Sequence, residues 1–441
     1  MAMDGSVLPV SDRRAAAVPK EPGRSLVLVN RIHPPDTGAT GRLVADLASR
    51  LAAAGWQVTV LACGEPQTCR TGGYVLRRVG GPLSGRRARD AMVQIRALAA
   101  AIAALPPTDV LVTLTDPPML PVVAPVATLR CGALVHWSMD VYPELLPLVG
   151  RALPRPAGAL LSALRDRALF RHDAVVAVGA CMAERLERRL RGRVPITVVE
   201  PWPDPAIGWH VGVGTGLRHR LLAATGAASL VVYAGTLGRS HPLGALETAV
   251  RAAASARVTG RPMPGFVFVG QGDGMAALRA RVGEGLPGVV FLPSRPAPLL
   301  AELLAAADVH LAVLAAEAEG LMVPCKVHGA LAAGRPVVFA GPSGGAAARR
   351  VLAGGGRVVA PDDGIGLLAA ATALAGETEP ARSARRERAQ AAVSDLDADA
   401  AAAVWDGLLG DLVIRGRRAV GGALLSSPTA VVRPLSEARR D

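Results

Sequence analysis

Lysine is almost missing from this sequence. Lysine and arginine together number 49 in 441 residues, and only Lys20 and Lys326 are lysines, which leaves 47 arginines. Positions that need only a positive charge have therefore gone to arginine. Arginine presents a planar fork of donors, whereas lysine presents a compact ammonium on a thin stem. Lys326, within residues 320–326, therefore indicates a position where a guanidinium does not serve; chance survival of a lysine is the alternative.

Aromatic residues are also scarce, at 3% of the chain, and the five cysteines show no metal-ligand spacing. Packing must come from Ala, Val, Leu and Gly, which suits helices lying close against parallel strands. An odd number of cysteines in a chain of this length indicates a reduced, intracellular protein. Zinc-finger spacing, RNP-like aromatic stretches and basic tracts interleaved with aromatics are missing too, which argues against nucleic acid as a partner.

Membrane-directing segments are not evident either. The first twenty residues contain no apolar core of a secretory signal, and the chain contains no uncharged apolar run of about 18 residues. We therefore expect a cytoplasmic protein, at most peripheral to a membrane. Positive charge, in contrast, is abundant: the net charge of +13 predicts anionic partners, with phosphorylated substrates and membrane surfaces ranking above nucleic acid.

The length of 441 residues predicts two domains. Apolar strands alternate with helical stretches in two series. The predicted strands lie at residues 25–30, 57–62, 109–115, 133–137, 174–178 and 196–200, and then at 230–235, 266–270, 289–292, 309–314, 336–340 and 357–359. Such βα units require right-handed crossovers and parallel strands. The predicted fold class is therefore α/β, with two Rossmann-like doubly wound parallel-sheet domains that face a cleft.

Breaks in this pattern set the predicted boundaries. We expect a disordered tail over residues 1–24, an N-terminal Rossmann-like domain over 25–205, a linker over 206–228 and a C-terminal Rossmann-like domain over 229–380. One long Ala-rich helix over 381–412 and a mobile tail over 413–441 would follow. Because ligands bind outside the carboxyl ends of strands in such sheets, the loops that follow the strands are the places to search.

Two of these loops combine glycine with a helix start. Gly38 lies in a loop of small residues just before a predicted helix, whose free N–H groups suit an anion; a tight strand-to-helix turn explains it equally well. Gly235, Gly238 and Arg239 follow the first strand of the second series and could grip a diphosphate. The sequence shows no Gly-x-Gly-x-x-Gly dinucleotide fingerprint in the first loop.

Two further loops lie in the second series. Gly270 and Gly272 belong to a three-glycine turn, which lets a backbone approach a ligand closely but is more often only a turn. Glu317 and Glu319 lie just upstream of Lys326 and could accept hydrogen bonds from sugar hydroxyls, with a solvated acidic turn as the alternative. Lys326 is expected in the first turn of the helix that follows, where the helix dipole adds positive potential.

Three segments resemble a known family. They are DVYPE at 140–144, YAGTLGRSH at 233–241 and EGLMVPCKVHGALAAGRP at 319–336. Their order and content are similar to the GT-B glycosyltransferases of family 4, over roughly residues 25–375. The resemblance is greatest to bacterial members, of the colanic-acid type, that act in O-antigen, capsule and exopolysaccharide assembly.

The resemblance implies transfer of a sugar from a nucleotide diphosphate sugar to a hydroxyl, with retention at the anomeric carbon. It assigns Arg239 and Lys326 to the diphosphate and Glu319 to the donor sugar, and it puts Asp140 and His136 on the acceptor side. The remaining implied donor-binding residues are Gly38, Gly235, Gly238, Gly270, Gly272, Leu321, Met322 and Val323. The leaving phosphate would help to deprotonate the acceptor. Cationic side chains would replace a divalent metal, so no cofactor is expected.

The chain departs from the family pattern at three places. A second glutamate common in the family would fall near Gly329, Cys325 replaces the usual Ser or Thr before the lysine, and the cleft histidine has no match in the Asp140 loop. We expect Cys325 to be a free thiol with a lowered pKa, because Lys326 and a helix N-terminus adjoin it. A nucleotide-sugar epimerase of GT-B architecture and a non-catalytic GT-B partner protein are the alternative functions.

A basic stretch follows the Asp140 loop. Apolar residues alternate there with the arginines at positions 151, 155, 165, 167 and 171. Such a surface could rest on anionic lipid at the inner face of the cell membrane. The family resemblance adds a lipid-linked saccharide as the acceptor. An ordinary surface helix with a solvated arginine face explains the pattern equally well from the sequence alone.

Overall fold

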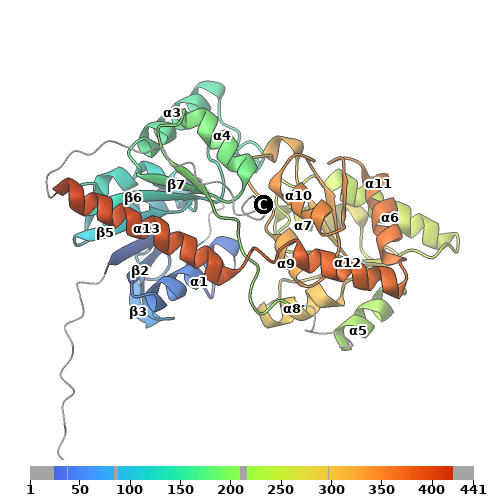
Figure 1. The fold of residues 1–441 in the computed structure, drawn as a ribbon. Helices are drawn as coiled ribbons and strands as arrows, with labels where there is room; N and C mark the ends of the chain where they lie inside the picture. The colour runs from blue at the N-terminus through green and yellow to red at the C-terminus, as the bar shows by residue number, and fades with distance from the viewer. Residues whose placement is uncertain (1–23, 37, 84–87, 209–215, 296, 421–441) are drawn as a thin grey trace, which may run out of the picture.

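The computed structural model describes residues 24–36, 38–83, 88–208, 216–295 and 297–420. Over these residues the chain forms two α/β domains, each built around one sheet (Figure 1). The tail predicted at residues 1–24 lies outside the described residues except for Arg24. The predicted fold class, two doubly wound sheets, is confirmed.

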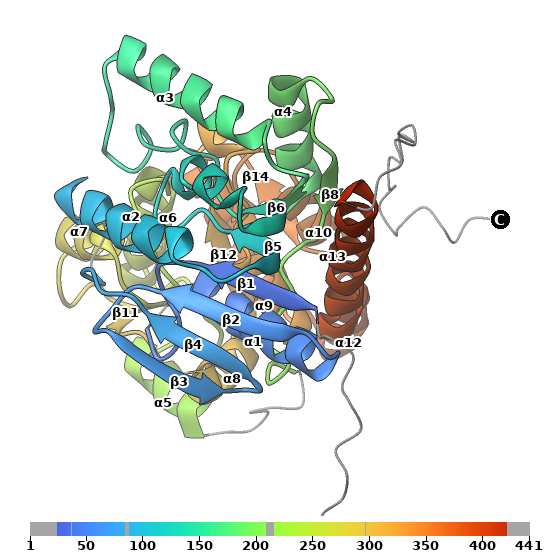
Figure 2. The same ribbon diagram turned by 90° about the vertical axis from the view of Figure 1, so that its left-hand side faces the viewer.

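The first sheet has eight strands in the order β3-β4-β2-β1-β5-β6-β7-β8. They are β1 Ser25–Val29, β2 Gln57–Ala62, β3 Gln67–Thr71, β4 Tyr74–Arg78, β5 Thr108–Thr113, β6 Cys131–Ser138, β7 Ala174–Ala177 and β8 Ile196–Val198. The helices are α1 Ala39–Ala53, α2 Ala88–Ala103, η1 Leu120–Val122, η2 Ala124–Ala127, α3 Arg155–Leu169 and α4 Ala180–Leu190. Figure 2 shows the strands from β3 to β6 side by side in this order.

The second sheet has six strands in the order β11-β10-β9-β12-β13-β14, all parallel. They are β9 Leu230–Ala234, β10 Gly265–Val269, β11 Val289–Leu292, β12 Val309–Val313, β13 Val337–Ala340 and β14 Arg357–Val359. The helices of this domain are α5 Gly216–Thr225, α6 Leu243–Val258, α7 Asp273–Val282, α8 Ala297–Ala306, η3 Ala316–Ala318, α9 Lys326–Ala332, α10 Ala346–Ala353, α11 Gly364–Ala375 and α12 Glu379–Ala391. Helix α13, Ala398–Val420, follows them and packs on the first domain. The strand order reverses between β9 and β12, which makes this the expected ligand edge.

Strands β3 and β4 were not expected from the sequence. β3 pairs antiparallel with β4 at the edge of the first sheet, and all five of its residues are exposed. A strand without a buried face has no apolar alternation, so the pattern that locates the other strands is absent. The segment 206–228, expected as a linker, contains helix α5, while residues 209–215 lie outside the described residues.

The prediction of one helix over residues 381–412 is wrong. Two helices, α12 and α13, replace it, and α13 extends to Val420. The Asp397 carboxylate accepts hydrogen bonds from the backbone N–H groups of Asp399 and Ala400, both at 2.9 Å, and so caps the start of α13. Helix α13 begins anew because the chain crosses back to the first domain, where it lies along the first sheet (Figure 1). The rest of the tail predicted at 413–441 lies outside the described residues.

Buried tryptophan side chains hold helix α13 against the first domain. Trp405 of α13 is fully buried, with its ring 4.9 Å from that of Trp137 in β6. Trp137 in turn stacks on Trp202, which lies in the first crossing between the domains. Arg350 of α10 holds both crossings, since it donates to the Glu200 carboxylate at 3.1 Å and to the Asp395 carboxylate at 2.6 Å. The two domains are therefore fastened together at both crossings.

Candidate active site

Loops that follow the strands of the two sheets touch each other. The N–H of Val141, in the loop after β6, donates to the carbonyl oxygen of Leu321, in the loop after β12, at 2.8 Å. Asp140 and Met322 form an isolated β-bridge at the same place. The structure thus brings together two segments that the sequence analysis selected independently, one from each domain.

Lys326 is the first residue of α9, and its side chain reaches back to the end of β9. Its Nζ donates to the hydroxyl of Tyr233 and to the carbonyl oxygen of Thr236, the latter at 3.2 Å. It also lies 4.2 Å from the centre of the Tyr233 ring. Burial lowers the pKa of Lys326 to about 8. The Lys326 side chain therefore contacts the loop after β9, at the edge of the second sheet where the strand order reverses.

Arg239 extends from the same loop, five residues after the end of β9, and lies close to the other domain. Its side chain is 59% exposed and lies 3.6 Å from the Asp273 carboxylate. A Cβ built on Gly150, in the N-terminal domain, would lie 2.8 Å from Cδ of Arg239. The guanidinium therefore sits where the domains meet and remains open to an anionic ligand.

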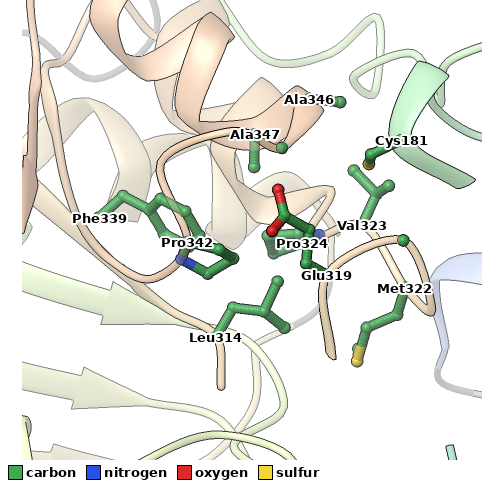
Figure 3. A pocket seen from close by; sticks show the side chains of 12 residues that line it. Cys181, Leu314, Glu319, Met322, Val323, Pro324, Phe339, Pro342, Ala346 and Ala347 are labelled. Atoms are coloured by element: carbon green, nitrogen blue, oxygen red, sulfur yellow. The ribbon is translucent and has the colours of Figure 1, made fainter. Parts of the chain in front are cut away.

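Glu319 lines a pocket of about 220 Å³ between the domains. Its carboxylate points into this pocket, which is otherwise bordered by apolar side chains from α10, β13 and the loop 322–324 (Figure 3). Cys181 of α4 contributes from the N-terminal domain. Met322 and Val323 line the same pocket, but the Leu321 side chain is only 2% exposed and packs into the core of the first domain. Only the main chain of Leu321 could therefore face a ligand.

The glycines of the donor-side loops have a packing reason. A Cβ on Gly270 would overlap the carbonyl oxygen of Gly235, and one on Gly272 would lie 2.5 Å from the carbonyl oxygen of Leu237. Gly272 also has φ of 116°, which side-chain-bearing residues rarely adopt. Gly38 caps α1 with the side chain of Ile32 directly against it. Tight packing thus explains these glycines whether or not a ligand approaches them.

Asp140 and His136 line the same pocket, of about 290 Å³, in the N-terminal domain. Burial, together with the nearby Asp116 carboxylate, raises the pKa of Asp140 to about 7. His136 is 3% exposed, with Nδ1 at 3.3 Å from the hydroxyl of Thr113, and burial lowers its pKa. His136 therefore lies beneath Asp140 as a neutral side chain within the sheet.

Sequence reasoning missed three groups at this site. Tyr233 and His241 contact Lys326, although both fall within the segment 233–241 that was singled out. Arg31 and Asp116 form a two-point ion pair at 2.6 and 2.8 Å between the loops after β1 and β5. The strand order of the first sheet reverses between β1 and β5, so the switch-point rule would have directed attention there.

The expected reactive thiol at Cys325 is contradicted. Burial raises the pKa of Cys325, and this exceeds the opposing effects of the Arg42 and Lys326 cations. The sequence suggested the two positive influences but could not show that the thiol is removed from water. Over the described residues, no three His, Cys, Asp or Glu side chains come together as a metal site.

The prediction of a basic surface after the Asp140 loop also needs correction, because one of its arginines is buried. Arg165 is 3% exposed, and its guanidinium donates to the carboxylates of Glu144 at 2.5 Å and Asp166 at 2.6 Å. It also donates to the carbonyl oxygen of Tyr142 at 2.7 Å. Arg165 therefore fixes the Asp140 loop from below and is no part of a basic surface. Among the helices of the described chain, none is long and apolar enough to cross a membrane.

Family models match both domains. A model described as a glycosyl transferase 4-like domain matches residues 38–202, and one described as glycosyl transferases group 1 matches residues 228–376. The two matches together cover most of the chain and include both loops of the interdomain contact. The chain is a glycosyltransferase. No curated protein matches its sequence significantly.

Solved structures agree with this glycosyltransferase fold. Sucrose-phosphate synthase from Thermosynechococcus elongatus is 18% identical, with a TM-score of 0.64 over 89% of this chain and 100% of that one. Trehalose-6-phosphate synthase from Burkholderia multivorans is 15% identical, with a TM-score of 0.66 over 92% and 100%. WaaG, a glycosyltransferase involved in lipopolysaccharide biosynthesis, is 18% identical, with a TM-score of 0.61 over 87% and 99%. These likenesses establish the GT-B fold.

Proposed function

We propose that this glycosyltransferase moves a sugar from a nucleotide diphosphate sugar to an acceptor hydroxyl, with retention at the anomeric carbon. The observation that supports it most is the bond from Val141 to Leu321, 2.8 Å long, between the loops that carry Asp140 and Glu319. A donor sugar held beside Glu319 would thereby face an acceptor held beside Asp140. A similar structure, a trehalose-6-phosphate protein from E. coli, is described as bound with UDP-2-fluoro glucose, which favours this class of donor.

The donor diphosphate would lie between Arg239 and Lys326. Arg239 is exposed, and Lys326 borders the loop from which Arg239 extends. Positive groups fixed in place before the reaction stabilise the charge that develops on a leaving phosphate. N–H groups at the start of α1, next to Gly38, could add to this potential. With these groups we propose that no divalent metal is needed.

The acceptor would bind beside Asp140. A carboxyl group with a pKa of about 7 is held partly protonated near neutral pH, so it can accept or donate a hydrogen bond to a sugar hydroxyl. Asp140→Asn keeps the shape and removes the charge. We expect this substitution to raise KM for the acceptor more than for the donor, and to flatten the pH dependence of kcat/KM around pH 7.

The acceptor in this proposal is a lipid-linked saccharide, and the pathway is the assembly of a cell-surface polysaccharide or glycolipid, of the colanic-acid type. Helix α3 favours it, because Leu160 and Leu164 are 61% and 42% exposed on a helix that also exposes Arg155 and Arg167. Each arginine near an anionic surface contributes about 1 kcal/mol of binding. The similarity to WaaG points to the same kind of pathway.

Vesicle sedimentation tests the membrane part. The protein should sediment with anionic vesicles at low salt and be released at high salt. Arg155→Glu with Arg167→Glu should weaken binding at least tenfold. A matched pair of substitutions on α7, Arg279→Glu with Arg281→Glu, should leave it unchanged. Retention in the supernatant with anionic vesicles at low salt would favour a soluble acceptor.

Product analysis with labelled nucleotide sugars tests the central proposal. Transfer of label to an acceptor supports it, whereas isomerised nucleotide sugar indicates an epimerase and binding alone indicates a non-catalytic partner protein. The donor is best sought first by thermal stabilisation, because a ligand present at 100 times its Kd adds about 2.7 kcal/mol to stability.

A further inference from the structure

Lys326 has a third neighbour besides Tyr233 and Thr236. Its Nζ lies 3.5 Å from Nε2 of His241, in the loop after β9. What these two nitrogens can do for each other depends on where the imidazole carries its proton. The hydrogen-bond partners of the other ring nitrogen, Nδ1, show which nitrogen carries the proton.

Nδ1 of His241 is an acceptor. The backbone N–H of Gly238 donates to it at 3.2 Å, and the hydroxyl of Ser240 lies 3.3 Å from the same nitrogen. A neutral imidazole carries one proton, so the proton resides on Nε2. The doubly protonated ring is excluded as well, because burial and the Lys326 charge lower the pKa of His241 to about 3. An N–H of His241 therefore faces Nζ of Lys326.

This polarity fits a neutral amine better than an ammonium. An ammonium has three N–H donors and no acceptor, so it would oppose the Nε2–H of His241. A neutral amine has two N–H groups and one lone pair. The hydroxyl of Tyr233 donates to Thr236 at 2.9 Å, which leaves its oxygen to accept from Lys326. The two N–H groups can therefore go to Tyr233 and Thr236, and the lone pair accepts from His241.

We propose that Lys326 is a switchable cation: the site without ligand shifts it toward its neutral amine, diphosphate binding fixes the ammonium, and His241 is the positioning residue that sets this balance. This inference rests on the proposed diphosphate site. The proton comes from solvent when the diphosphate binds and returns to solvent when it leaves. The titratable groups that face Lys326 are Tyr233 and His241 from the β9 side and Cys325, which directly precedes it at the N-cap of α9. Burial of the site, which lowers the pKa of Lys326 to about 8, acts in the same direction.

The proposal explains why a lysine occupies this position in a chain with 47 arginines among 49 basic residues. A guanidinium does not lose its proton in proteins, whereas a buried ammonium does so readily. An arginine at position 326 would hold the diphosphate with permanent charge. A lysine can bind the diphosphate of the donor and release that of the product by exchanging one proton.

Titration of Lys326 in the free protein tests the first part of the proposal, which concerns its protonation in the absence of ligand. The chain has two lysines, so protein labelled with ¹⁵N and ¹³C at lysine gives two side-chain ammonium resonances, which Lys20→Arg assigns. We expect Lys326 to titrate near pH 8. Titration of both lysines above pH 10 would overturn the proposal.

Two substitutions should move the Lys326 midpoint in opposite directions. His241→Asn retains an acceptor for Gly238 and deletes the facing N–H, so the midpoint should rise by one pH unit or more. Tyr233→Phe retains the ring and removes an acceptor for the ammonium, so the midpoint should fall. If His241→Asn folds, as its circular dichroism would show, and leaves the midpoint unchanged, then His241 has only a structural role and the proposal fails.

Proton uptake on binding UDP or GDP tests the second part of the proposal, that diphosphate binding fixes the ammonium. At pH 8.5 in weak buffer, an indicator dye should report uptake by the wild type and none by Lys326→Arg. Affinity of the wild type should fall about tenfold for each pH unit above the Lys326 midpoint. Binding without uptake would overturn the switch. Failure of both nucleotides to bind would contradict the proposed function instead, while the titration of the free protein still decides the state of Lys326.

Discussion

Replacing Lys326 with methionine should make the protein more stable while it abolishes sugar transfer. Methionine has a similar straight chain, fills the same space and has no charge to bury. Lys326 is partly buried, and this burial lowers its pKa from 10.5 to about 8. The folded protein therefore disfavours the charge that the proposed diphosphate site requires. A functional group that costs stability is a known compromise in enzymes.

The size of this effect follows from the pKa. A tenfold change in a protonation equilibrium corresponds to about 1.4 kcal/mol, so a fall from 10.5 to about 8 sets an upper limit of about 3.4 kcal/mol. Lys326 is only half-buried, and the substitution also removes its hydrogen bonds to Tyr233 and Thr236. We therefore expect a gain of about 1–2 kcal/mol at pH 7.

The gain in unfolding free energy of Lys326→Met over the wild type must also depend on pH in a defined direction. Between pH 8 and 10.5 the unfolded chain binds more protons at Lys326 than the folded chain does, so wild-type stability rises with pH across this window relative to the variant. The advantage of Lys326→Met should thus be full below pH 8 and fade toward pH 10.5.

Urea unfolding from pH 7 to pH 10 measures this difference without adding salt. Lys20→Met is the control and should follow the wild type at every pH. A lower urea midpoint for Lys326→Met at pH 7, or an advantage that does not change with pH, would refute the reasoning. The same variant should lose at least a hundredfold in kcat/KM, since one charge partner of a transition state is worth about 2.7 kcal/mol or more.

Three further substitutions and one removal test other parts of the site. Arg239→Ala should retain the wild-type unfolding transition and lower kcat/KM by about a hundredfold or more, measured with the identified donor. Arg165→Met should destabilise the fold by about 3 kcal/mol, because it removes the buried guanidinium that pairs with Glu144 at 2.5 Å and with Asp166 at 2.6 Å, whereas Arg167→Met should unfold like the wild type. Gly270→Ala should lower the melting temperature by several degrees, because its Cβ would overlap the carbonyl oxygen of the neighbouring loop. EDTA should leave the transfer rate unchanged; loss of activity that Mg²⁺ or Mn²⁺ restores would show that a metal is needed.

Parallel strands were the most predictable feature of the chain. The segments at 57–62, 289–292 and 357–359 are observed as strands with the predicted bounds. Strands buried on both faces consist of short, nearly continuous apolar runs, and that signal depends only on local sequence. Strand β3 lacks this signal because all five of its residues are exposed, and β4 is a short strand that is only partly buried.

Charge was much less predictable than strand position. Arg165 looked like one member of a basic surface, yet it is buried against Glu144, 21 residues earlier in the chain. The thiol of Cys325 has two cations nearby, but burial dominates its pKa. Residue type and spacing show which charges exist, whereas desolvation depends on every segment that packs around them.

The sequence by itself determined the two-sheet fold and selected Lys326, whose rarity marks it among 47 arginines. Only the tertiary structure decided what surrounds that lysine. Tyr233 and His241 precede it by 93 and 85 residues, and the parallel order of β9 and β12 brings them to one edge. A side chain's protonation depends on these distant donors, acceptors and the exclusion of water, and none of them is contained in the local sequence.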